Sequence, residues 1–144
     1  MHRLLSMLLL FSCSFAASAW DGVANRYRVA IDAEATHAEV EADLWLDGDV
    51  VALFNVVDAP GLENGQASLL EGLQVTDASG AALAVQDLGG GDFRLPRGGR
   101  IHARYRVRLA HDQYAWPAGM EEVGYRTDEG LMLTGYSLFL ADGA

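Results

Sequence analysis

The sequence has 144 residues, of which 51% are hydrophobic and 21% are charged, a balance that suits one globular domain and excludes an intrinsically disordered chain. Its formal net charge of −10 would repel a phosphate backbone, which argues against nucleic acid as a partner. Sixteen glycines against three prolines predict many tight turns, and therefore short strands rather than long helices.

The first segment of the chain, residues 1–19, has the pattern of a secretory signal peptide. Arg3 supplies the positive charge, residues 4–11 form a short apolar stretch, and Ala17-Ser18-Ala19 gives the small-x-small cleavage pattern. The apolar stretch is too short to span a bilayer. We therefore predict that this segment is removed, and that the remaining chain is soluble and exported to the periplasm or secreted.

Cys13 is the only cysteine, and it lies inside the predicted signal peptide. Cleavage would leave a mature chain with no disulfide and no reactive thiolate. An alternative is lipidation, because Leu10-Phe11-Ser12-Cys13 loosely resembles a bacterial lipoprotein box. Phe11 fits that box poorly, so we do not expect a lipid anchor at Cys13.

Short runs of alternating apolar and polar residues begin near residue 27, a period typical of half-buried strands. Residues 27–31 form the first run and residues 38–46 form the second. Asp47-Gly48 predicts a hairpin turn, with residues 50–56 as the returning strand.

The second half of the chain continues in the same way. Further strands are predicted over residues 69–75, 82–87, 93–95, 100–109 and 131–140, the last with a short turn at Gly135. The pattern predicts an all-β fold, an antiparallel β-sandwich of about seven to nine short strands. We expect residues 20–144 to form this one domain.

Two of the predicted strands carry opposite charges on their polar faces. The acidic strand presents Glu39, Glu41 and Asp43, and the basic strand presents Arg104, Arg106 and Arg108. Cross-strand pairs of opposite charge stabilise a sheet, so we predict that the two strands are neighbours, with Glu41 and Arg106 coupled. The alternative is that the arginines bind an anion.

The residues that catalysis would need are missing or scattered. The four histidines, His2, His37, His102 and His111, do not form the closely spaced pair of a zinc helix. There is no Gly-x-Ser-x-Gly elbow, and Gly89-Gly90-Gly91 lacks the lysine of a phosphate loop. We therefore expect no cofactor, no catalytic metal and no enzymatic activity.

The segment after the most regular strand has a distinctive series of motifs. Residues 105–112 read Tyr-Arg-Val-Arg-Leu-Ala-His-Asp, residues 116–119 read Trp-Pro-Ala-Gly, Glu122 and Tyr125 follow, and residues 133–140 close the series. Together they resemble the amino-terminal domain of the glycyl aminopeptidase family of gluzincin zinc metallopeptidases, metallopeptidase family sixty-one. The resemblance covers about residues 26–140.

The resemblance implies a β-sandwich that precedes a catalytic domain, and it is that catalytic domain which carries the His-Glu-x-x-His zinc helix. No catalytic residue of the family has a counterpart here. We therefore expect a non-catalytic accessory domain that packs against a peptidase catalytic domain, in cis or in trans.

The expected contact surface lies in the loop over residues 111–125 and the strand over residues 131–140, with an exposed apolar patch on the order of several hundred Å². Its candidate residues are His111, Asp112, Trp116, Pro117, Glu122, Tyr125, Tyr136 and Phe139. The alternative function is a stand-alone binding module of the cell envelope that recognises a peptide or a glycan through Trp45 and Trp116.

Overall fold

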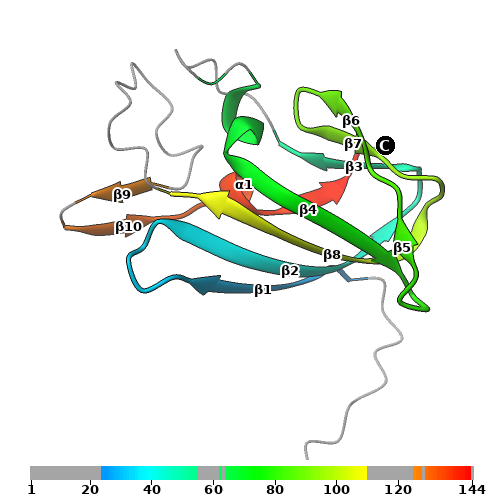
Figure 1. The fold of residues 1–144 in the computed structure, drawn as a ribbon, viewed down its shortest axis with the longest axis horizontal. Helices are drawn as coiled ribbons and strands as arrows, with labels where there is room; N and C mark the ends of the chain where they lie inside the picture. Colours follow the sequence, from blue (N-terminus) through cyan, green and yellow to red (C-terminus); the bar gives the residue numbers. More distant parts are fainter. Residues whose placement is uncertain (1–23, 55–61, 63, 110–124, 128, 144) are drawn as a thin grey trace, which may run out of the picture.

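The computed structural model describes residues 24–54, 62, 64–109 and 129–143, and the backbone of residues 125–127. Within them, strands form two antiparallel sheets and one separate hairpin (Figure 1). The first sheet has the order β1 (Arg26–Ile31), β2 (His37–Leu46), β8 (Gly99–Arg108), β4 (Leu70–Asp77) and β5 (Ala82–Leu83). The second sheet has the order β11 (Leu140–Asp142), β3 (Val50–Leu53), β7 (Asp92–Arg94) and β6 (Gln86–Gly89).

The remaining elements are short. Strands β9 (Tyr125–Thr127) and β10 (Gly130–Met132) pair as the hairpin. A single 3-10 turn, η1 (Gly65–Leu69), precedes β4, and one four-residue helix, α1 (Gly135–Leu138), precedes β11. No helix in the described residues is long and apolar enough to cross a membrane. The predicted all-β antiparallel sandwich is confirmed, and nine of the eleven strands in the described residues form its two sheets.

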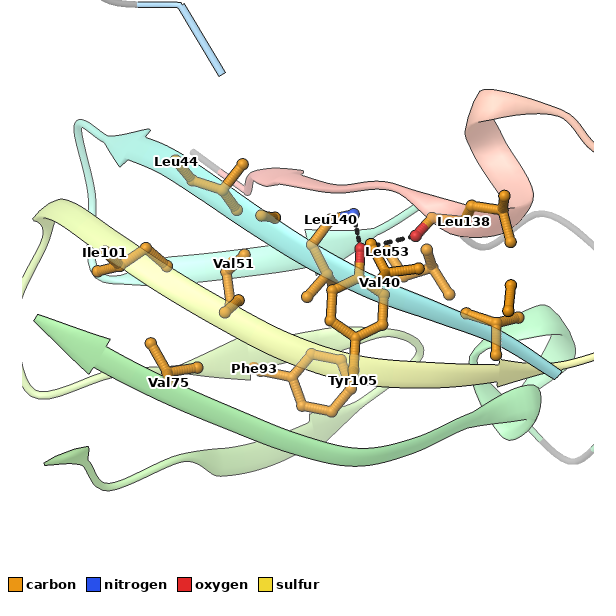
Figure 2. Close-up of a cluster of buried hydrophobic side chains, with 14 of the residues drawn as sticks. Val40, Leu44, Val51, Leu53, Val75, Phe93, Ile101, Tyr105, Leu138 and Leu140 are labelled. Atoms are coloured by element: carbon orange, nitrogen blue, oxygen red, sulfur yellow. Dashed lines mark hydrogen bonds between the residues drawn. The ribbon is translucent and has the colours of Figure 1, made fainter. Parts of the chain in front are cut away.

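The core lies between the two sheets and follows from the period-two pattern of the sequence. Strand β2 buries every second residue from Ala38 to Leu46, and β8 does the same from Ile101 to Val107. The second sheet contributes Val51, Leu53, Phe93 and Leu140 from the opposite side (Figure 2). Because one face of each long strand is buried, a slip of one residue in register would expose the whole set.

The connection after β2 differs from the sequence prediction. The hairpin predicted at Asp47-Gly48 is wrong: β3 does not pair with β2 but crosses to the second sheet, between β11 and β7. Strand β2 is already flanked by β1 and by β8, which pairs with it over ten residues. A four-residue strand such as β3 would form fewer hydrogen bonds with β2 than β8 does. Strand β8 therefore takes the position beside β2, and β3 pairs in the second sheet.

Two further predicted strands are interrupted in the structure. The strand predicted over residues 82–87 is divided into β5 and β6, which belong to different sheets. The strand predicted over residues 131–140 is divided into β10 and β11 by helix α1. In the first case the chain passes from the first sheet to the second within the predicted strand, and in the second it passes from the separate hairpin to the second sheet.

Candidate functional site

Two tyrosine hydroxyls of the first sheet form hydrogen bonds with the backbone where α1 leads into β11. The Tyr105 hydroxyl donates to the carbonyl oxygen of Leu138 at 2.7 Å and accepts from the backbone N–H of Leu140 at 3.2 Å (Figure 2). The Tyr27 hydroxyl donates to the carbonyl oxygen of Leu140 at 2.6 Å. Burial raises the pKa of both phenols, so both stay protonated and able to donate at neutral pH.

Helix α1 is held by a capping box, which fixes the side on which each of its residues faces. The Thr134 hydroxyl accepts from the backbone N–H of Ser137 at 3.3 Å, and the Ser137 hydroxyl accepts from that of Thr134 at 3.3 Å. In this arrangement Leu138 is buried in the core, while Tyr136 is 59% exposed. The Gln66 side-chain amide also donates to the carbonyl oxygen of Tyr136 at 3.4 Å.

Most of the exposed large apolar side chains in the described residues lie in β10, in α1, between these two elements, or just after β3. The ring of Phe54, which follows β3, lies against that of Tyr136 with centroids 4.8 Å apart. Five of the seven large apolar side chains that are exposed in the described residues belong to this region, and we call them the C-terminal apolar surface: Phe54, Leu131, Met132, Leu133 and Tyr136. Scattered exposed apolar residues are normal on a protein surface, whereas a concentration of them marks a place for contact with another molecule.

The predicted contact residues fall into three groups. Tyr136 lies on the C-terminal apolar surface. Phe139 is only half-buried, and its ring stacks on Tyr27 with centroids 4.3 Å apart. Tyr125 is in β9, of which only the backbone is described, and the others lie outside the described residues: His111, Asp112, Trp116, Pro117 and Glu122.

Phe54 was not among the residues predicted from the sequence. A signal was present, because Val50, Ala52 and Phe54 alternate with the buried Val51 and Leu53. That alternation puts Phe54 on the outer face of β3. The sequence alone could not show that α1 would bring Tyr136 against it.

The outer face of the first sheet is charged rather than apolar. Strands β2 and β8 are neighbours, as their charges predicted. Glu41 contacts Arg28 at 3.0 Å and Arg104 at 3.1 Å. The predicted partner of Glu41 was Arg106, but the register places Arg104 opposite it, and Arg106 instead contacts Glu71 of β4 at 3.1 Å. These carboxylates favour a structural role for Arg104 and Arg106 over the alternative of an anion-binding strip.

Both described histidines lie beside carboxylates. The His37 ring has Asp32 3.4 Å from Nδ1 and Glu71 3.7 Å from Nε2, and His102 Nδ1 lies 3.0 Å from Asp43. The part of the chain that the structure describes contains no group of three or more histidine, cysteine, aspartate or glutamate residues placed to hold a metal ion.

Comparison with known proteins gives a similarity in fold. No protein-family model and no curated protein sequence matches the chain. The fold is similar to part of the crystal structure of an aminopeptidase N family protein from Idiomarina loihiensis, with a TM-score of 0.60 and 17% sequence identity. The match covers 82% of this chain and 19% of that protein, so the chain spans about a fifth of its structural neighbour.

Proposed function

We propose that this chain is a non-catalytic accessory β-sandwich domain of an exported zinc metallopeptidase similar to the glycyl aminopeptidases, and that it packs against the catalytic domain. The structural neighbour supports this proposal because a domain of this fold occurs there as a minor part of an aminopeptidase N family protein. In the same proposal the catalytic domain is supplied in cis or in trans, and residues 1–19 direct export.

The observation that carries the proposal is the C-terminal apolar surface. Leu131, Met132 and Leu133 are exposed in succession, and Tyr136 and Phe54 lie against each other on the surface. Burying apolar area stabilises a contact by about 25 cal/mol per Å². An exposed aromatic pair is suited to the centre of a domain interface, where aromatic residues contribute most, and the three exposed aliphatic side chains precede it in the sequence.

The sequence itself supports a non-catalytic role. It has no His-Glu-x-x-His motif anywhere in its 144 residues. In the family that the sequence resembles, peptide hydrolysis depends on that motif, which lies in another domain. In this proposal the accessory domain contributes recognition and packing, and the chemistry is performed elsewhere.

The first test is genetic. DNA sequence beyond codon 144, in the same frame or in an adjacent gene, is expected to encode a His-Glu-x-x-His zinc helix within a catalytic domain. Unrelated genes on both sides would contradict a partner encoded there, and would favour the alternative of a stand-alone envelope binding module.

The second test uses that catalytic domain as a separate chain and measures its binding to residues 20–144 by calorimetry. Replacing Leu131 and Tyr136 by serine should weaken binding at least about tenfold, since aromatic contacts at the centre of an interface often contribute more than about 1.4 kcal/mol. Leu88→Ser is the matched control, because Leu88 is 41% exposed, as is Leu131, but lies on β6. Equal losses in both variants would contradict the proposed surface.

A further inference from the structure

An exposed tryptophan stands on the otherwise charged outer face of the first sheet. Trp45 is 42% exposed and lies near the end of β2, directly opposite Arg100 of β8. Its indole N–H donates to the Asp47 carboxylate at 3.0 Å, and its backbone N–H donates to the Asn25 side chain at 3.0 Å. The indole is therefore held in one orientation with its polar atom already bonded, which leaves the carbon surface of the ring as the part open to a ligand.

Arg100 differs from most other arginines on this face because it makes no ion pair with a described residue. Among the described residues, Arg28, Arg104 and Arg106 each contact a glutamate, whereas Arg100 is exposed and makes no ion pair. Residues directly opposite each other in an antiparallel pair have Cβ atoms about 4.5–5.5 Å apart. The Arg100 guanidinium, which makes no ion pair with a described residue, thus lies within reach of a molecule that rests on the Trp45 ring.

A hollow of about 390 Å³ adjoins Arg100 on the side away from Trp45. It lies where β4 ends and β8 begins, on the right of Figure 1, and it is lined by Asp77, Ala78, Ser79, Arg97, Gly98 and Arg100. Arg97 forms an ion pair with Asp77, so Arg100 is the arginine of this lining that makes no ion pair with a described residue. The positive charge of Arg100 stands out in a chain whose formal net charge is −10.

The walls of the hollow are fixed by their own hydrogen bonds. The Asp77 carboxylate accepts from the backbone N–H groups of Ser79 at 2.8 Å and Ala81 at 3.0 Å, which closes the turn between β4 and β5. On the other wall, Gly98 passes so close to the β2–β3 connection that a Cβ there would lie 2.1 Å from the Gly48 carbonyl oxygen. Because these loops are already held in place, they lose little conformational entropy when a ligand binds.

We infer that this end of the sheet binds an acidic saccharide. A pyranose ring would rest its C–H face on the Trp45 indole, and its carboxylate would lie against the guanidinium group of Arg100. Planar guanidinium groups suit a carboxylate because they can donate two parallel hydrogen bonds to it. The lining of the hollow is mostly polar and charged, which favours a sugar over a peptide with an apolar side chain. The inference is independent of the proposed catalytic partner.

The test is an NMR titration of residues 20–144 with trigalacturonate, followed through the indole N–H of Trp45. Neutral maltotriose and sodium acetate, each added to the same concentration, separate the contributions of charge and of the sugar ring. We expect trigalacturonate to shift the Trp45 signal in a saturable way, and the two other compounds to shift it much less. No saturable shift, or equal binding of maltotriose or of acetate, would overturn the inference.

Variants at the two ends of β8 locate the site. Arg100→Gln should weaken trigalacturonate binding at least about tenfold, as expected for a charge-assisted hydrogen bond. Arg108→Gln is the matched control, because Arg108 also lacks an ion pair among the described residues but lies roughly 27 Å further along the strand at about 3.4 Å per residue. Circular dichroism verifies that both variants are folded, and equal weakening by both would refute the assignment to Arg100.

Discussion

Phe139 stacks on Tyr27, with ring centroids 4.3 Å apart and ring planes inclined by 21°. The pair joins β1, at the edge of the first sheet, to the residue just before β11, at the edge of the second. An edge strand has a neighbour on one side only, so contacts of this kind decide whether it stays in place.

The Tyr27–Phe139 pair should show a measurable coupling. In a double-mutant cycle with Tyr27→Ala and Phe139→Ala, we expect a coupling free energy of about 0.5–1.5 kcal/mol, the range for stacked aromatic pairs. Urea unfolding of the four proteins measures it, and the cycle cancels the separate loss of the Tyr27 hydroxyl bond. Additive effects of the two substitutions would show that the rings do not stabilise each other.

The Tyr105 hydroxyl should contribute more to stability than an exposed hydroxyl does. Tyr105→Phe leaves the buried Leu138 carbonyl and Leu140 N–H without their partner, and should lower the free energy of unfolding by about 1–3 kcal/mol. Tyr136→Phe removes a hydroxyl from a 59% exposed ring and should change it by less than about 0.5 kcal/mol. The prediction fails if urea unfolding gives the same free energy for both variants.

The charges on the outer face should couple according to the observed register. A double-mutant cycle between Glu41 and Arg104, which contact each other at 3.1 Å, should give about 0.2–1 kcal/mol, decreasing at high salt. The same cycle between Glu41 and Arg106 should give a smaller value, since Arg106 faces Glu39 and contacts Glu71. A larger coupling to Arg106 than to Arg104 would contradict the register.

Acid should destabilise the turn between β1 and β2. Hydrogen bonds from Thr36, through its hydroxyl and its backbone N–H, lower the pKa of Asp32 from 3.8 to about 2. A carboxyl whose pKa is lower in the folded state stabilises it above pH 3.8, and this stabilisation is lost as the pH falls from about 4 to about 2. Urea midpoints for Asp32→Asn should therefore vary less over this range than those of the natural protein. Equal variation in the two proteins would contradict the stabilising role of the Asp32 carboxylate.

Export should remove the first 19 residues. Intact mass measurement of the protein secreted by a bacterial host should show Trp20 as the first residue, and Ala19→Leu should block processing because the cleavage site requires small residues. A mass that includes Cys13 with an attached lipid would instead establish the lipoprotein alternative.

The sequence predicted the parts of the fold that depend on one strand at a time. The alternating pattern of β2 and β8 identified both strands and their buried faces, and their opposite charges identified them as neighbours. It could not assign strands to sheets, because Asp47-Gly48 permits either a hairpin or a crossing, and competition with β8 decides between them. For the candidate surface, the role of Tyr136 stays a prediction, and its contact with Phe54 could not be predicted, because that contact depends on how α1 packs near β3.

The crossing from β2 to β3 has a consequence for the order in which the molecule can assemble. Each sheet contains strands from the first half of the chain that pair with strands from the second half. Strand β2 pairs with β8, and β3 pairs with β11. Long-range pairings of this kind form slowly, because distant segments must meet before any bond stabilises them. Neither layer can therefore be completed until the second half of the polypeptide has been made.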